Sequence, residues 1–598
     1  MRVVDAIAQW MDKAGIEAYI GYYGGALWPM MDALVDYPHI KAYQAKHESH
    51  AVHMADVYWR TTGKIAPVIV TKGPGLMNCV GGIASAMHDT APILLIGGAG
   101  STHLLGKGGM QEMYYKGFED AIGVFRPVTK GVWSLVRPDT AIDVFNQAYK
   151  TMMSGRPGPV FVQVPFDVQQ GSVEGEIEAP VVRSVSSSLR ADSASIETTL
   201  DLLEASKQPV IVAGGGVKFS PGGAAALLEL AETLEIPVAT SLTAKGILSE
   251  DHPLSLGPVG RSGTDSAAEA TRAADLVIAI GARFSDNHTS NWRKGYIYDF
   301  PRTRLVHVDV DASELGRNYP VDVAAVSDAA TFIRDVIDGW HSRGLKSGWQ
   351  EWVATTSARH VEWQDSIRTV TEATSDPIHP ARMCYEIGEV MGDSGRVFVD
   401  VGDVIQYAEP YMKIRHGDQW HINAGMAEMG WASSGVLGAL VGDRSRPAIA
   451  LTGDGAFNMV SQILATAVEY DLPGIWVILN NYELGIERKG TMRMHNRLHP
   501  WATFIRADTG EPYNPDFVKL AEANGARGEL VDTADAFAPA LRRAIESGRP
   551  TVIDVRIDLT VPTYFTSGID RAYPATWEES YPQHSSLTLT ERPDATES

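Results

Sequence analysis

Cysteine is scarce in this sequence, and long apolar runs are missing from it. Only Cys79 and Cys384 occur among 598 residues, far apart in the chain, which excludes a framework of disulfide bonds. No run of about 18 apolar residues occurs, so we expect no membrane-spanning helix. Residues 1–15 contain charged side chains and no uninterrupted apolar stretch, so we also expect no signal peptide. These absences favour a protein of the cytoplasm.

Basic residues are outnumbered by acidic ones. Lysine and arginine total 51 and aspartate and glutamate total 73, which leaves a formal net charge of −22. A surface this acidic disfavours binding to nucleic acid or to an anionic membrane, so we expect a small-molecule ligand. An anionic ligand would need a local cluster of basic side chains. The composition is otherwise ordinary for a soluble globular protein, with 44% hydrophobic and 21% charged residues.

Short apolar runs, closed by glycine or proline, alternate with helical patterns along the whole chain. Such runs are typical of strands that are buried on both faces of a parallel sheet. We therefore predict an α/β fold with three doubly wound parallel-sheet domains. The runs lie at residues 66–71, 92–97, 160–164, 209–213, 276–281, 305–310, 397–401, 448–452, 475–479 and 551–555.

Domain boundaries are expected where this alternation lapses. The stretch around residues 172–195 is polar and rich in serine, as a linker is. We expect a first domain over 1–175, a middle domain over 195–340, a third domain over 375–560 and a tail over 561–598.

The clearest motif follows an apolar strand in the third domain. Gly453-Asp454-Gly455-Ala456 comes directly after residues 448–452, and Asn481 follows the next strand. The carboxyl ends of parallel strands lie at one edge of the sheet, where α/β proteins bind ligands. Carboxylate, amide and carbonyl oxygens suit Mg²⁺, and glycine lets backbone N–H groups approach a phosphate. The motif predicts a site for magnesium and a phosphate group.

This Asp–Asn pair resembles the signature of thiamine-diphosphate enzymes. The resemblance implies that Asp454 and Asn481 bind Mg²⁺ through their side chains and Glu483 through its main-chain carbonyl. The metal then holds the cofactor's diphosphate, beside Gly453, Gly455 and Ala456 of the glycine motif.

The first domain resembles the matching half of the acetolactate synthase branch of that family. The similar segments are His47-Glu48, the loop Gly73-Pro74-Gly75, and Gly109-Met110-Gln111-Glu112. The resemblance implies that Glu48 is catalytic: it hydrogen-bonds to the aminopyrimidine ring and promotes loss of the thiazolium C2 proton. Gln111 is then an active-site amide.

The resemblance extends from about residue 5 to about residue 560. It implies a pyrimidine-binding domain, a Rossmann-like middle domain and a diphosphate-binding domain, in that order. In this family the cofactor lies between domains of two subunits, so a homodimer or homotetramer is implied. A non-catalytic relative is disfavoured because Glu48, Asp454 and Asn481 are all present.

Two further segments of the third domain match the family in part. Met429 takes the place of the bulky apolar residue that bends the cofactor, and Gly402 resembles the glycine of the diphosphate-side loop. Asp403-Val404 stands where acetolactate synthases commonly have Gln-His, so the substrate side has diverged.

The middle domain carries weaker signals. Gly214-Gly215-Gly216 follows one strand, and Gly281-Ala282-Arg283 follows another. Relatives hold FAD, ADP, coenzyme A or nothing in this domain, and the sequence leaves these alternatives open. Arg283 is a candidate partner for a phosphate, and Asp309 and Asp311 are candidates for a ribose.

The segment after the Asn pair decides between reactions. Residues 486–506 are rich in basic side chains, among them Arg493 and Arg497, which suggests an anionic substrate; a solvated surface loop is the alternative. Gly485 and Ile486 are expected beside the cofactor, followed by Glu487.

The pair Ile486-Glu487, an apolar residue followed by a glutamate, resembles the corresponding segment of 2-hydroxyacyl-CoA lyases. The resemblance implies a reversible lyase that cleaves a 2-hydroxyacyl-CoA, an acyl-CoA substrate, to formyl-CoA and a ketone or aldehyde, with Glu487 as the base. Two alternatives stay open. One is an acetolactate synthase-like transferase that decarboxylates a 2-oxoacid, and the other is a sulfoacetaldehyde acetyltransferase-like enzyme.

Aromatic side chains distinguish the tail from a plain linker. We expect them to pack over the mouth of the active site and exclude water from it. They are Tyr564, Phe565, Tyr573, Trp577 and Tyr581.

Overall fold

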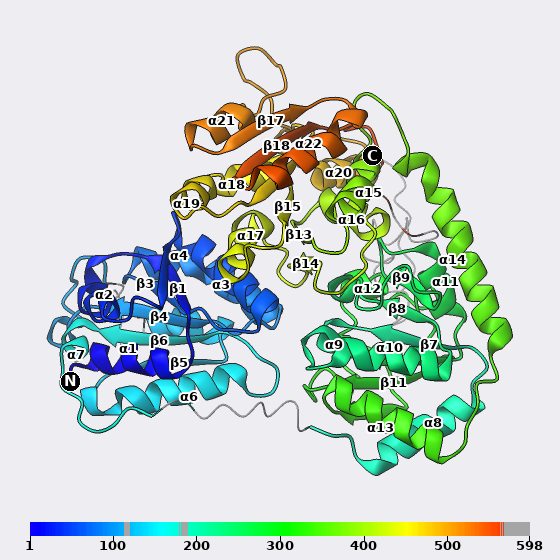
Figure 1. Ribbon diagram of the computed structural model, residues 1–598, viewed down its shortest axis with the longest axis horizontal. Helices are drawn as coiled ribbons and strands as arrows, with labels where there is room; N and C mark the ends of the chain where they lie inside the picture. Colours follow the sequence, from blue (N-terminus) through cyan, green and yellow to red (C-terminus); the bar gives the residue numbers. More distant parts are fainter. Residues whose placement is uncertain (113–119, 179, 181–188, 563, 565, 567–598) are drawn as a thin grey trace, which may run out of the picture.

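The computed structural model describes residues 1–112, 120–178, 180, 189–562, 564 and 566. These residues form three six-stranded sheets in which all neighbouring strands are parallel. Figure 1 shows the three sheets as separate layered units, the first in blue, the middle in green and the third from yellow to red. The predicted α/β fold with three parallel-sheet domains is confirmed.

The first sheet has the strand order β2-β1-β3-β4-β6-β5. Its strands are short and wholly apolar in the centre, as in β4, where every residue is buried. The strands are β1 (Ala18–Tyr22), β2 (Lys41–Gln44), β3 (Val68–Val70), β4 (Leu94–Ala99), β5 (Gly131–Ser134) and β6 (Val160–Pro165). The helices are α1 (Val3–Lys13), α2 (Trp28–Val35), α3 (Glu48–Thr62), α4 (Pro74–His88), α5 (Asp120–Phe125), α6 (Ala141–Met153) and α7 (Phe166–Gln169).

The middle sheet has the order β12-β11-β10-β7-β8-β9. Read from β9, this is the dinucleotide-binding order 3-2-1-4-5-6, so the Rossmann-like prediction is confirmed. The strands are β7 (Pro209–Ala213), β8 (Val238–Thr240), β9 (Ser255–Pro258), β10 (Leu276–Ile280), β11 (Arg304–Asp309) and β12 (Val323–Val326). The helices are α8 (Ser193–Ala205), α9 (Gly215–Phe219), α10 (Gly223–Leu234), α11 (Asp265–Ala273), α12 (Asp286–Thr289) and α13 (Ala329–Ser342).

The third sheet, β14-β13-β15-β16-β18-β17, repeats the strand order of the first. Its strands are β13 (Arg396–Val399), β14 (Trp420–Ile422), β15 (Ala448–Gly453), β16 (Ile475–Asn480), β17 (Arg527–Val531) and β18 (Thr551–Arg556). Its helices are α15 (Pro380–Met391), α16 (Asp403–Tyr411), α17 (Trp431–Gly442), α18 (Asp454–Val460), α19 (Ile463–Glu469), α20 (Gly485–His495), α21 (Phe517–Ala523) and α22 (Ala534–Ser547). The long helix α14 (Gln350–Thr371) runs along the outer side of the molecule between the middle and third domains (Figure 1).

Helices α3 and α17 join the first and third domains through one continuous hydrophobic core. Gly435 and Gly438 allow the close approach, because a side chain at either position would overlap Val57 or the Met54 backbone. At the edge of this contact the Trp431 indole donates to Asp56 at 2.8 Å. None of the helices in the described part of the chain combines the length and apolarity needed to cross a bilayer.

Candidate active site

Asp454 lies at the point where β15 passes into α18. Its side chain is buried, and its oxygens accept hydrogen bonds from the backbone N–H groups of Gly455 at 2.8 Å and Tyr482 at 2.7 Å. Asn514 donates to the same carboxylate at 2.7 Å. Burial raises the pKa of Asp454 to about 6, against these hydrogen bonds, which lower it. A cation bound to this carboxylate would favour its ionised form.

Asn481 follows β16, the strand beside β15, so its side chain lies near that of Asp454. Asn481 is buried, and its Oδ1 accepts a hydrogen bond from the Glu483 backbone at 3.2 Å. The contact of Tyr482 N with Asp454 ties the two strand ends together. β15 and β16 are neighbouring parallel strands, so their carboxyl ends lie at one edge of the sheet. This agrees with the expectation from the sequence that Asp454 and Asn481 lie at one edge.

Glycines shape the space around these two residues. Gly402 has a φ of +97°, which side chains rarely adopt, and it faces Ile486 at the start of α20. A Cβ at Gly455 would lie 2.7 Å from Leu484 Cδ2, and one at Gly485 would lie 2.5 Å from Asp403 Oδ2. The backbone therefore approaches closely here, as a cradle for phosphate oxygens requires.

Met429 borders the same space, since its Cε lies 3.6 Å from the position of a Cβ on Gly455. The residue after it, Gly430, is fixed by Asp400, which accepts its backbone N–H at 2.9 Å. Asp400 also accepts from Thr452 at 2.9 Å and is fully buried. Asp400 thus fixes the backbone next to Met429. No sequence motif indicated this role.

The donor set fits magnesium and the diphosphate of thiamine diphosphate. Asp454 and Asn481 are buried oxygen donors at adjacent strand ends, and glycine backbone surrounds them. In the described ranges of the chain, no three His, Cys, Asp or Glu side chains gather into a metal site. The predicted site has only one such side chain, because its other ligands are an amide and a carbonyl.

Glu48 begins α3 in the first domain and is 8% exposed. Its Oε2 accepts a hydrogen bond from Asn78 at 2.8 Å, and its Oε1 lies 3.2 Å from where a Cβ on Gly75 would stand. Gly75 therefore leaves room for the Glu48 carboxylate beside the start of α4. This arrangement holds the carboxylate in one orientation, as a group that exchanges a proton with a bound ring requires.

Gln111 lies on the other side of the same loop. It has a φ of +62°, and a Cβ on Gly73 would overlap its carbonyl oxygen. Next to it, Glu112 pairs with Lys72 at 2.8 Å in a largely buried contact. The structure therefore brings Glu48 and Gln111 to one loop of the first domain.

The residues of the predicted site form two clusters within one chain, one in the first domain and one in the third. Among the hydrogen bonds and ion pairs described here, none joins Glu48 or Gln111 to Asp454 or Asn481. The chain presents both halves of a cofactor site on different domains.

Glu487, the base implied by the resemblance to lyases, lies on α20. It is exposed on the first turn of that helix. Its basic neighbours contact other carboxylates: Arg488 pairs with Glu483 at 3.1 Å, and Lys489 with Asp403 at 2.6 Å. Glu483 is the buried carboxylate of this segment, and burial raises its pKa to about 7.

The three arginines predicted to bind substrate do not come together. Arg493 and Arg497 are exposed, at the end of α20 and just beyond it. Arg283 instead donates to the His88 carbonyl at 2.7 Å and lines a cavity of about 500 Å³ between the three domains. Lys218, Arg156 and Asp309 line the same cavity.

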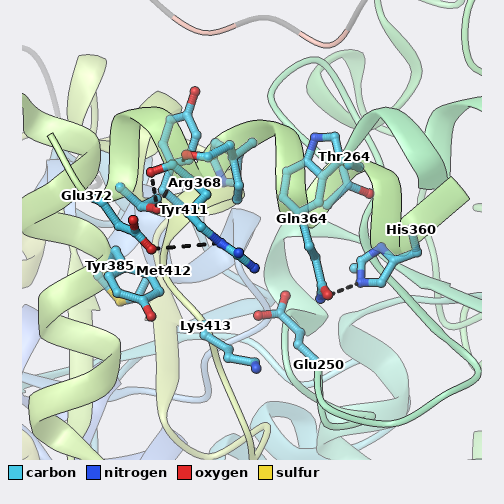
Figure 2. A pocket seen from close by; sticks show the side chains of 15 residues that line it. Glu250, Thr264, His360, Gln364, Arg368, Glu372, Tyr385, Tyr411, Met412 and Lys413 are labelled. Carbon is cyan, nitrogen blue, oxygen red and sulfur yellow. Dashed lines mark hydrogen bonds and ion pairs between the residues drawn. The ribbon is translucent and has the colours of Figure 1, made fainter. Parts of the chain in front are cut away.

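A second cavity, of about 190 Å³, lies between α14 and the end of α16. Figure 2 shows two polar pairs in its lining, Gln364 with His360 and Arg368 with Glu372. The residues that line it include none of the predicted site residues.

The tail meets the body at the few residues that are described. Tyr564 packs edge-on against Tyr411 of α16, with ring centres 5.5 Å apart, and Thr566 donates to the Gly260 carbonyl at 2.9 Å. Phe565 and the other tail aromatics, Tyr573, Trp577 and Tyr581, lie outside the described residues.

Family models and full-length relatives agree with this geometry. The chain matches the N-terminal TPP binding domain of thiamine pyrophosphate enzymes over residues 1–119, the central domain over 196–336 and the C-terminal TPP binding domain over 400–555. A probable acetolactate synthase large subunit of Methanocaldococcus jannaschii is 33% identical over 569 residues, 93% of this chain and 92% of that protein.

Bacterial relatives match over similar lengths. The acetolactate synthase large subunit of Haemophilus influenzae is 29% identical over 570 residues, 94% of this chain and 95% of that protein. The one of Corynebacterium glutamicum is 31% identical over 559 residues, 92% of this chain and 86% of that protein.

The fold, the two clusters and these matches define a thiamine-diphosphate-dependent enzyme that catalyses carbon–carbon bond chemistry. Within that class, the chain belongs to the acetolactate synthase family. The prediction of a 2-hydroxyacyl-CoA lyase is wrong, because the relatives are named acetolactate synthase large subunits. In the single chain, Glu487 is exposed and its basic neighbours pair with Glu483 and Asp403.

Proposed function

We propose that this chain is the catalytic subunit of an acetolactate synthase-type enzyme that decarboxylates pyruvate and joins the remaining two-carbon unit to a second 2-oxoacid. With two pyruvate anions and one proton, the products are acetolactate and carbon dioxide. The observation that carries the proposal is the end-to-end similarity to acetolactate synthase large subunits, over 93% of the chain in one relative.

The third-domain cluster would hold the metal and the diphosphate. Asp454 and Asn481 would offer side-chain oxygens to Mg²⁺, and the Glu483 carbonyl would be the third ligand from the protein. The backbone at Gly402, Gly453, Gly455, Ala456 and Gly485 would offer N–H groups to the phosphate oxygens. Met429 and Ile486 border the same space with apolar surface, which excludes water from the reacting atoms.

The first-domain cluster would hold the pyrimidine ring. Glu48 is buried and oriented by Asn78, so it can share a proton with a ring nitrogen at a fixed position. Gln111 offers an amide on the other side of the Gly73 loop. Thiamine diphosphate, when bound, supplies a carbon acid whose conjugate base attacks the carbonyl carbon of the oxoacid.

A second subunit would bring the two clusters together, so we propose a homodimer or a higher homo-oligomer. Apolar side chains beside the site motifs support this: Met110 is 85% exposed, Met426 45% and Met459 61%. Exposed methionines next to three different site segments are typical of a surface that a partner covers.

The cavity between the domains suits a nucleotide, and we propose one with a phosphate group there. Gly215 begins α9 at the carboxyl end of β7, and Arg156, Arg283 and Lys218 supply positive charge. Burial lowers the pKa of Lys218 to about 7, so a phosphate would favour its protonated form. FAD, ADP and coenzyme A all carry this chemistry, and heat release followed by chromatography and absorbance distinguishes them.

The proposed reaction is tested with the purified protein, pyruvate, thiamine diphosphate and Mg²⁺. We expect carbon dioxide and acetolactate, both dependent on cofactor and metal and both lost in Glu48→Gln. A protein that binds the cofactor and releases no carbon dioxide from pyruvate or any other 2-oxoacid would overturn the proposal.

A further inference from the structure

Helix α20 borders the third-domain cluster but is poorly anchored by packing. None of its residues is buried, and its first turn carries Gly485 and Ile486, which face Asp403 and Gly402. A helix without a fully buried side chain depends more on polar contacts to hold its position. The contacts that α20 makes through its side chains are therefore informative.

Lys489 makes two of these contacts at once. Its ammonium donates to Asp403 Oδ2 at 2.6 Å and to the Tyr407 hydroxyl at 2.8 Å, and it lies 5.3 Å from the centre of the Tyr407 ring. The Lys489 side chain is 17% exposed and that of Asp403 11%, so water screens the pair only weakly. Asp403 and Tyr407 lie one turn apart on α16, which begins directly after Gly402.

The same group extends to the start of the tail. The Tyr407 hydroxyl donates to the Val561 carbonyl at 3.2 Å, while it accepts from Lys489. Tyr407 thus contacts α20 on one side and the chain that leaves β18 on the other. Gly485 has to be glycine in this arrangement, because a Cβ there would lie 2.5 Å from Asp403 Oδ2.

We propose that Lys489 is a positioning residue that fastens the first turn of α20 to the amino end of α16, and thereby keeps Ile486 against Gly402 at the edge of the cofactor cradle. Its charge is taken up by Asp403 and not by a substrate anion. The role rests on the proposed function only in that α20 borders the cofactor site.

Hydrogen exchange on the full chain, without cofactor or substrate, tests the fastening directly. Lys489→Met and Asp403→Asn should each speed amide exchange in residues 485–495, on the order of tenfold, with little change elsewhere. Lys489→Arg should keep exchange near that of the wild type, because a guanidinium can still reach the carboxylate. Lys519→Met is the matched control, since Lys519 is exposed and pairs with the exposed Asp516, the residue just before α21.

Kinetics on pyruvate separate positioning from substrate binding. Positioning predicts weaker thiamine-diphosphate binding and a lower kcat in both variants, with KM for pyruvate within about twofold of the wild type. A double variant no worse than either single one would support direct coupling. Unchanged exchange in residues 485–495 of Lys489→Met overturns the proposal, and so does a raised KM for pyruvate with kcat and cofactor binding intact. If the wild type does not act on pyruvate, hydrogen exchange and the affinity for thiamine diphosphate, measured by calorimetric titration, still decide this inference separately.

Discussion

The side-chain amide of Asn514 donates to Asp454 Oδ2 at 2.7 Å and to Asn480 Oδ1 at 2.8 Å. Asn514 comes from the loop before α21, and it bridges the ends of β15 and β16 from outside the sheet. It therefore orients the carboxylate that we assign to the metal.

Removal of this bridge should weaken metal and cofactor binding without abolishing it. Asn514→Ala should reduce the affinity for thiamine diphosphate with Mg²⁺ by about tenfold to 100-fold, as is usual for a group that orients a metal ligand. Asp454→Ala should abolish binding in the same calorimetric titration. Asn524→Ala is the control, because its amide donates to the Leu520 carbonyl of α21, away from Asp454. Wild-type affinity in Asp454→Ala would place the metal elsewhere.

Glu48→Gln should retain thiamine diphosphate but slow exchange of the cofactor's C2 proton by about two orders of magnitude or more. The reason is that Glu48 is a buried carboxylate held in one orientation by Asn78. Hydrogen–deuterium exchange at C2, quenched in acid and followed by NMR, measures this rate. An exchange rate equal to that of the wild type would remove Glu48 from the mechanism.

Glu409 predicts a pH dependence of stability. It is fully buried between α16 and the middle domain, and burial raises its pKa from 4.5 to about 8, although Lys245 and Arg261 act to lower it. The folded chain then keeps a proton that the unfolded chain loses above about pH 4.5. Stability should therefore fall between pH 4.5 and 8, by at most about 1.4 kcal/mol per pH unit, and level off above pH 8.

Glu409→Gln should remove this contribution and raise the Tm most at pH 8. Thermal unfolding of both proteins at several pH values measures it. Parallel Tm curves for the variant and the wild type would show that Glu409 is not the group responsible.

Gly438→Ala should destabilise the chain, by about 1–3 kcal/mol, because the added methyl group overlaps the Met54 backbone between α17 and α3. Gly123→Ala in α5 is the control, since no atom lies within 4 Å of the position of its Cβ. Denaturant unfolding compares the two. Equal stability of the two variants would mean that the helices separate without cost.

The parts of this fold that depend on local pattern could be predicted from the sequence. The apolar runs at β15 and β16 predicted buried parallel strands, and adjacent strand ends bring Asp454 and Asn481 together whatever their separation in sequence. Pairs of side chains from distant elements could not be predicted, because they produce no local pattern in the sequence. Nothing in the sequence links Lys489 to Asp403, or Asn514 to Asp454.

The sequence also did not show where α20 begins, and therefore which of its side chains are exposed. The resemblance to lyases implied Glu487 as a base, but α20 begins at Gly485 and Glu487 is exposed on its first turn. Glu483, which precedes the helix, is the carboxylate that faces inward and meets Arg488. The two glutamates lie four residues apart in the sequence, but Glu483 is buried and Glu487 is exposed. The sequence did not show which of them would be buried.

Pyruvate labelled with ¹³C at C2 tests the central claim most directly. Incubation with the protein, thiamine diphosphate and Mg²⁺ should give acetolactate in which two labelled carbons are adjacent, seen in the NMR spectrum as ¹³C–¹³C coupling. Label at C1 should appear in equal parts as carbon dioxide and as the product's carboxylate. If the cofactor binds, yet no coupled pair forms and the C1 label stays in pyruvate, the chain is not a decarboxylating enzyme that joins two oxoacids.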